Sequence, residues 1–170
     1  LPCLDVRFPE TVDAIGDRAF SKDPEVVAIL GKAMAEGALA GGVLPVIKHI
    51  PGHGRARVDS HLELPRVNAA ISSLESVDFR PFKALSHVSL GMTAHIVYEG
   101  IDPNTAGTQS AKVIQEIIRG EIGFDGCLMS DDISMKALGG SFEDRSGKII
   151  EAGCDIVLHC NGDMDEMIAV

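Results

Sequence analysis

Apolar strand-like runs alternate with amphipathic helical patterns along the whole of this 170-residue chain. Five strands are predicted, over residues 1–6, 43–48, 90–97, 124–129 and 155–160. Strands that alternate with helices form a parallel sheet with helices packed on its faces. The sequence therefore predicts an α/β protein, and the polar residues that follow several strands favour a (β/α)₈ TIM barrel, whose active site lies at the carboxyl ends of its strands.

Five strands are too few for a closed barrel of eight. We therefore expect residues 1–170 to form one incomplete barrel domain with open edges, through which copies of the chain could associate.

Two helical segments carry clear sequence signals, and a third helix is predicted over residues 142–152. Asp23-Pro24 predicts the start of a helix, and Ser110 predicts the cap of another. The residues expected to face inward in the first helix are Val26, Val27, Leu30, Met34 and Ala38. Those expected to face inward in the second are Val113, Ile114, Ile117 and Ile118.

Composition excludes several classes of partner. A net charge of −10 argues against a surface for nucleic acid or for anionic membranes. No apolar run reaches the length of a membrane span. The four cysteines show no CxxC spacing, which indicates a reducing compartment such as the cytoplasm rather than a disulfide framework or a zinc site. With no Trp and one Tyr, a sugar site here would depend on hydrogen bonds.

A loop rich in histidine and glycine follows the strand predicted over residues 43–48. Within it, Asp59 and His61 stand two residues apart, so the carboxylate can orient the imidazole. Such a pair makes a proton-transfer group near neutral pH. A lone histidine would more often be an ordinary surface residue, and Asp59 is what favours the catalytic interpretation of His61. His53, between two glycines, is interpreted as part of the loop architecture.

Further candidates stand at strand ends. Lys48 and His49 end one strand, where neighbouring side chains normally point to opposite faces, so that one would be solvated and the other packed. Asp131 and Asp132 end another strand, where an aspartate can either act chemically or cap the following turn. His95 is interpreted as a hydrogen-bonded strand-end residue.

These segments together closely resemble the family 3 glycoside hydrolases, and more narrowly the bacterial β-N-acetylglucosaminidases (β-hexosaminidases) that recycle peptidoglycan. The agreement covers nearly the whole chain, with Ile50 standing where the family usually has Phe. The matching segments are IGDRAF at 15–20, KHIPGHG at 48–54, DSH at 59–61, LP at 64–65, MTAHI at 92–96 and SDDISM at 130–135.

The resemblance implies an Asp131 nucleophile, a His61 acid/base supported by Asp59, and sugar-hydroxyl ligands Arg18, Lys48 and His49. It also implies retaining hydrolysis of terminal β-linked N-acetylglucosamine from (anhydro)muropeptides without metal or cofactor. By the same resemblance, the chain is a partial family 3 N-terminal-type catalytic barrel, and 1–170 alone is expected to be inactive or nearly so.

Two other functions stay open. One is a non-catalytic sugar-binding or structural part of such a barrel. The other is a metal-dependent hydrolase using His49, His53, Asp59 and His61, although their spacing matches no compact zinc motif, and activity that survives a chelator would exclude it.

Overall fold

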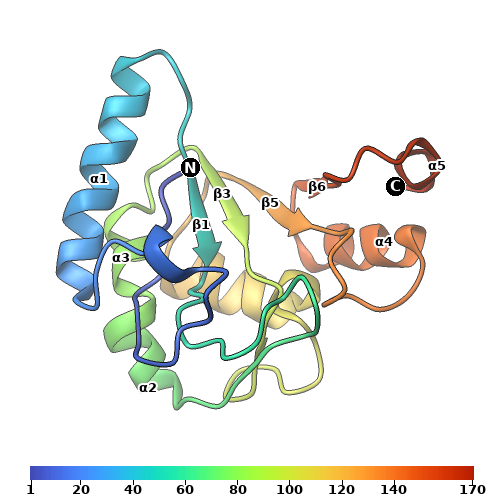
Figure 1. The fold of residues 1–170 in the computed structure, drawn as a ribbon, viewed down its shortest axis with the longest axis horizontal. Helices are drawn as coiled ribbons and strands as arrows, with labels where there is room; N and C mark the ends of the chain where they lie inside the picture. Colours follow the sequence, from blue (N-terminus) through green and yellow to red (C-terminus); the bar gives the residue numbers. More distant parts are fainter.

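A four-stranded parallel sheet forms the centre of the computed structural model, which describes residues 1–170 (Figure 1). Its order is β1-β3-β5-β6, and all three neighbouring pairs are parallel. The strands are β1 (Val46–Ile50), β3 (Leu90–Thr93), β5 (Cys127–Asp132) and β6 (Ile156–Leu158). The four strands of this sheet thus lie side by side in chain order, and helical segments connect them, as in the wall of a βα barrel.

The strand predicted over residues 1–6 was wrong in extent. Only Cys3 forms a β-bridge, parallel to Lys48 of β1. The Leu4 N–H donates to the Lys48 carbonyl, and the Lys48 N–H donates to the Pro2 carbonyl. Pro2 has no N–H to give, and further along it is the side chain of Asp5 that accepts the His49 N–H. The first residues therefore lie along β1 as an edge segment, beside four strands rather than five.

The run predicted as one strand over residues 90–97 is divided in two. After β3, the strand β4 (Val97–Tyr98) pairs with β2 (Arg66–Val67) in a separate two-stranded parallel sheet. Between them, the Ala94 N–H donates to the Ile50 carbonyl, and the Ile96 N–H donates to the Ala94 carbonyl. The chain thus bends at the rim of the main sheet.

Helical segments cover the sheet and connect its strands. In Figure 1, α1 and α3 lie together beside the β1 edge, and α4 lies beside β5 and β6. None of the helices has the length and apolar character needed to span a membrane. The α-helices are α1 (Pro24–Ala40), α2 (Ile71–Ser73), α3 (Arg80–Ala84), α4 (Phe142–Ala152) and α5 (Met164–Ala169). The short 3₁₀-helices are η1 (Gly16–Arg18) and η3 (Gly107–Gln109), and the π-helices are η2 (Leu74–Asp78) and η4 (Val113–Glu121).

Helix α1 starts as predicted, but of the five residues predicted to face inward only Val27 is buried. The Asp23 carboxylate accepts the Glu25 N–H, with Pro24 as the first helical residue. The buried residues are Val27, Gly31 and Ala35, spaced by four, whereas Val26, Leu30 and Met34 are 38%, 43% and 46% exposed. The reason is close packing through a small residue, because a Cβ at Gly31 would lie 2.2 Å from the side chain of Leu4.

The helix predicted after Ser110 is confirmed. The Val113 N–H bonds the Ser110 hydroxyl, and all four predicted inward residues of this segment are buried in the core. The segment winds as the π-helix η4 and ends before Gly123, whose φ of +74° suits glycine. The helix predicted over residues 142–152 coincides with α4.

Candidate active site

A cavity of about 140 Å³ lies at the carboxyl ends of β1 and β5. Of the six residues predicted to be catalytic or sugar-binding, all except Asp59 line it. The fold thus brings together side chains from four distant segments. The lining residues are Ala14, Ile15, Arg18, Lys48, His49, His53, Ser60, His61 and Asp131. The convergence places two cations, three imidazoles and a carboxylate around one small space.

Lys48 and His49 both line the cavity, although they are neighbours on β1. The pairing of β1 with β3 is irregular between Ile47 and Ile50, so the usual alternation of faces is interrupted there. The Lys48–His49 and Ile50–Pro51 peptide bonds are cis. As expected, one of the two is packed and the other is partly exposed, because His49 is buried and Lys48 is half-buried, but both contribute to the cavity wall.

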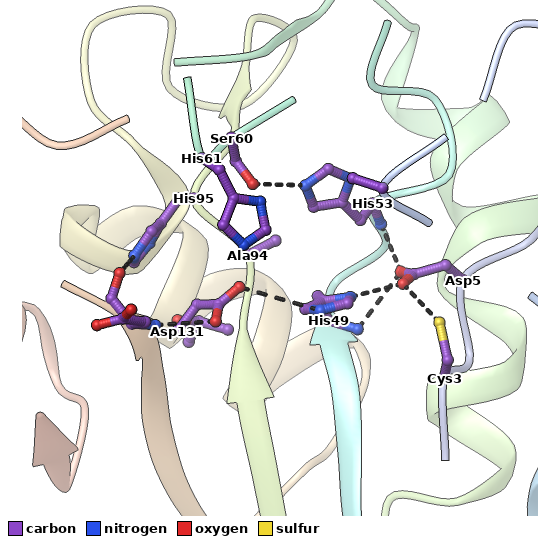
Figure 2. A network of polar contacts seen from close by, with 12 residues as sticks. Cys3, Asp5, His49, His53, Ser60, His61, Ala94, His95 and Asp131 are labelled. Carbon is purple, nitrogen blue, oxygen red and sulfur yellow. Dashed lines mark hydrogen bonds and ion pairs between the residues drawn. The ribbon is translucent and has the colours of Figure 1, made fainter. Parts of the chain in front are cut away.

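Asp5 is a site residue that the sequence analysis did not select. Its side chain is fully buried and receives four hydrogen bonds (Figure 2). His49 Nδ1 lies 2.6 Å from Oδ2, the His53 N–H donates to Oδ1 at 2.6 Å, the His49 N–H donates to Oδ1 at 3.4 Å, and the Cys3 thiol donates to Oδ2 at 3.1 Å. Its position directly after an apolar, strand-like run, like that of the other candidates, could have indicated a site residue.

The Asp5 carboxyl is ionised in this environment. Burial opposes its ionisation, but electrostatic attraction to the neighbouring His49 ring and the hydrogen bonds from His49 and His53 hold its pKa well below the usual value. The ionised carboxylate accepts every one of its four contacts. Because a carboxylate only accepts hydrogen bonds, the Nδ1 of His49 must carry a proton.

Asp131 lies on the other side of His49, with its Oδ2 3.9 Å from Nε2. Its Oδ1 accepts the Asp132 N–H at 2.8 Å, and the side chain is 17% exposed toward the cavity. Asp132 instead holds the turn, because its carboxylate accepts hydrogen bonds from the backbone and hydroxyl of Ser134 and from the Cys160 N–H. The two aspartates thus differ: one faces the cavity and the other braces the loop.

The Asp59–His61 pair forms as the sequence predicts. Asp59 Oδ1 accepts the His61 N–H at 2.9 Å and lies 2.7 Å from Nδ1 of the same residue. The backbone hydrogen bond from His61 is the main cause that lowers the pKa of Asp59. The carbonyls of Ser60 and His61 accept the N–H groups of Ala137 and Lys136, so this loop docks on the loop after β5.

His53 connects the buried and exposed parts of the site. Its N–H donates to Asp5, and its ring Nε2 lies 3.3 Å from the Ser60 hydroxyl. Burial, together with electrostatic repulsion from the neighbouring His49 ring, lowers its pKa to about 4, so the ring is neutral at pH 7. The Tyr98 hydroxyl donates to the Gly52 carbonyl and anchors the same turn from the core.

The remaining candidates have simpler environments. His95 is fully buried, with Nδ1 2.8 Å from the Thr108 hydroxyl and Nε2 3.1 Å from the Asp132 carbonyl, which confirms a hydrogen-bonded strand-end residue. The Arg18 guanidinium donates to the Ala14 carbonyl at the edge of the cavity.

The residues His49, His53, Asp59 and His61 contain no group of three whose ligand atoms all lie within 4.8 Å of one another. The three groups that do approach one another, with ligand atoms within 4.8 Å, are Cys3, Asp5 and His49. Burial and the neighbouring charge of Asp5 raise the pKa of the Cys3 thiol well above its usual value. Because the thiol keeps its proton, it donates a hydrogen bond to Asp5. The three groups therefore form a hydrogen-bond network in which Cys3 and His49 both contact the Asp5 carboxylate.

Comparison with known proteins now identifies the family. The profile of the Glycosyl hydrolase family 3 N terminal domain matches residues 1–170. The chain belongs to glycosyl hydrolase family 3. It therefore has the TIM-barrel type of fold of that N-terminal domain, and the sheet described above is a partial barrel of four strands.

Individual family 3 relatives agree with this assignment. The chain is 46% identical over 151 residues to a beta-hexosaminidase of Alkalilimnicola ehrlichii, a match that covers 86% of the chain and 43% of the relative. A family 3 beta-N-acetylglucosaminidase from Paenibacillus superposes with a TM-score of 0.94 at 31% identity, over 99% of this chain and 33% of that one. NagZ from Neisseria gonorrhoeae, in complex with N-trifluoroacetyl-D-glucosamine, superposes with a TM-score of 0.86 at 39% identity, over 95% of this chain and 46% of that one. The chain thus spans less than half the length of these relatives.

Proposed function

We propose that this family 3 domain belongs to a retaining β-N-acetylglucosaminidase. The observation that carries the proposal is the meeting, at one cavity, of the Asp131 carboxylate with a histidine that is paired to a second carboxylate, His61 with Asp59. The names of the relatives, and the sugar analogue bound by the gonococcal NagZ, support N-acetylglucosamine as the sugar.

In the proposed first step, Asp131 attacks the anomeric carbon and forms a glycosyl ester while the bond to the leaving oxygen breaks. His61 gives that oxygen its proton. In the second step, His61 takes a proton from water, the water oxygen attacks the anomeric carbon, and the ester bond breaks to restore the Asp131 carboxylate. Asp59 orients the His61 ring through Nδ1 in both steps.

Sugar binding would depend on hydrogen bonds from charged groups. The cavity lining contains no Trp, Tyr or Phe, whereas Arg18, Lys48 and His49 all face it. We assign these three residues to the sugar hydroxyls, with Arg18 and Lys48 as hydrogen-bond donors and His49 contacting a hydroxyl through Nε2.

The proposed substrates are terminal β-linked N-acetylglucosamine units of cell-wall (anhydro)muropeptides, hydrolysed in the cytoplasm. Four cysteines without disulfides suit a reducing compartment. Association of copies through open sheet edges stays a prediction.

The test is an assay of the natural full-length protein with N-acetylglucosaminyl-anhydromuramic acid and with an aryl β-N-acetylglucosaminide. Release of N-acetylglucosamine with retained β-configuration is expected. Saturable binding of the disaccharide without turnover would instead support the non-catalytic alternative, and inversion of the configuration would exclude a glycosyl ester.

A further inference from the structure

We propose that Asp5 is a positioning residue for the reaction: it fixes the orientation and the tautomer of His49, so that Nε2 faces Asp131 and the sugar. Asp5 does not line the cavity; of the residues that do, it accepts the backbone N–H of His53 and His49, and His49 is the one whose ring it contacts. The inference deepens the proposed function and rests on it for its kinetic part, whereas its structural part can be tested without any substrate.

The first support is that the buried Asp5 carboxylate has a full set of hydrogen-bond donors. Its carboxylate is fully buried, and all four of its contacts are donors from residues 3, 49 and 53. Burying a carboxylate costs several kcal/mol unless it is paired and hydrogen-bonded, so this cluster of donors is a built arrangement. A residue needed only to fill space could be apolar at this position.

The second support is the geometry of His49. With Nδ1–H held by Asp5 at 2.6 Å, the remaining ring nitrogen, Nε2, is the one directed at Oδ2 of Asp131, 3.9 Å away. Figure 2 shows this run of contacts from Asp131 through His49 to Asp5 and Cys3. A histidine is commonly fixed in one tautomer by the group that its other nitrogen contacts. The His49 side chain is 5% exposed, so rotation about its bonds is also restricted by packing.

The consequence for catalysis concerns the charge that changes on Asp131. In the proposed first step that carboxylate loses its negative charge as it becomes an ester. The ring of His49 stands between it and Asp5, whose charge stays constant behind the ring. A fixed dipole or charge next to a changing charge contributes most when it needs no reorganisation during the reaction. Asp5 therefore holds the His49 ring in one orientation, in which Nε2 faces both the sugar and Asp131.

The experiment compares Asp5→Asn with a matched control in the natural full-length protein. Asp78→Asn is the control, because Asp78 is also buried (2% exposed) but pairs with Arg55 instead of a histidine. Asp5→Asn should lower kcat on an aryl β-N-acetylglucosaminide by about 10²-fold with KM changed less than threefold, a cost typical of losing a group that orients a functional histidine. Asp78→Asn should change kcat less than threefold.

Two further measurements separate positioning from a merely structural role. The ¹⁵N resonances of the His49 ring should show a protonated Nδ1 in the unmodified protein, and the Nδ1 signal should shift in Asp5→Asn but not in Asp78→Asn. In a His49→Gln background, Asp5→Asn should cost little further kcat, because residues that act through one another are not additive.

Three results would overturn the proposal: an unprotonated Nδ1 in the unmodified protein, an unchanged Nδ1 signal in a folded Asp5→Asn variant, or the same kcat loss with and without His49. If Asp5→Asn does not fold, the spectrum of the unmodified protein decides. If the unmodified protein hydrolyses no N-acetylglucosaminide, the proposed function fails, while the ring spectra still report on the positioning.

Discussion

Two carboxylate–imidazole pairs in this domain have almost the same oxygen–nitrogen distance, but one pair is buried and the other is exposed. Asp5 lies 2.6 Å from Nδ1 of His49, and Asp59 lies 2.7 Å from Nδ1 of His61. The first pair has side chains 0% and 5% exposed, the second 28% and 62%. The comparison teaches that the same contact can suit different roles: we propose that the buried pair holds a ring in place and that the exposed pair exchanges protons with substrate and water.

The pairs also differ in how they are assembled. Asp59 accepts both the N–H and the ring of a residue two positions later, so this pair is made within one loop. Asp5 accepts from residues 44 and 48 positions later, so that pair exists only when the edge segment lies along β1. The exposed pair therefore needs only its own loop to form, while the buried pair needs the edge segment to lie along β1.

The largest effect is expected at Asp131, the proposed nucleophile. Asp131→Asn should lower kcat on an aryl β-N-acetylglucosaminide on the order of 10⁴–10⁶-fold, the scale of losing a nucleophile, while the protein stays folded. Steady-state kinetics and circular dichroism of the full-length protein test this. Near-normal turnover in the folded variant contradicts it, and labelling of Asp132 by a fluorinated substrate would move the nucleophile by one residue.

The exposed pair comes next. His61→Ala should cost roughly 10²–10⁴-fold on substrates with poor leaving groups, the usual contribution of a general acid, because nothing then protonates the departing oxygen. Asp59→Ala should show a weaker loss of the same kind. Kinetics on the disaccharide measure both, and a larger loss for Asp59→Ala than for His61→Ala would reverse the assigned order of roles.

His53 connects the two pairs, and its titration should appear in stability. Burial lowers its folded-state pKa from 6.5 to about 4, so the unfolded chain binds the extra proton first as pH falls. The free energy of unfolding should then drop by about 3 kcal/mol between pH 7 and pH 4 on account of this residue. Denaturant unfolding of the unmodified protein and of His53→Asn measures the difference. An equal pH dependence in both proteins would show that the ring is not kept neutral by burial.

The smallest effect is expected at Cys3, whose thiol donates to Asp5 of the buried pair. Cys3→Ala removes one of the four donors to Asp5 and should lower the free energy of unfolding by about 1–3 kcal/mol, because the other three hydrogen bonds remain. Cys3→Ser, which keeps a donor, should recover part of this loss in the same denaturant experiment. A serine variant less stable than the alanine variant would show that the thiol matters for packing alone.

The same contrast explains what could be predicted from the sequence. The Asp59–His61 pair was predictable because two residues in one loop suffice to make it, and helix α4 because its pattern and bounds are local. Asp5 was missed because its partner lies 44 residues away, across a β-bridge that no local pattern shows. The buried face of α1 was wrong for a related reason, since close approach at Gly31, rather than the larger apolar residues, decides which side packs.

The most direct test of the two roles is a series of aryl β-N-acetylglucosaminides with leaving groups of different acidity. The logarithm of kcat/KM is plotted against leaving-group pKa for the full-length protein, His61→Ala and Asp5→Asn. The account predicts a steeper dependence in His61→Ala, since protonation of the departing oxygen is lost, and a parallel, lowered line in Asp5→Asn. Equal slopes in all three proteins, or a steeper slope in Asp5→Asn alone, would contradict it.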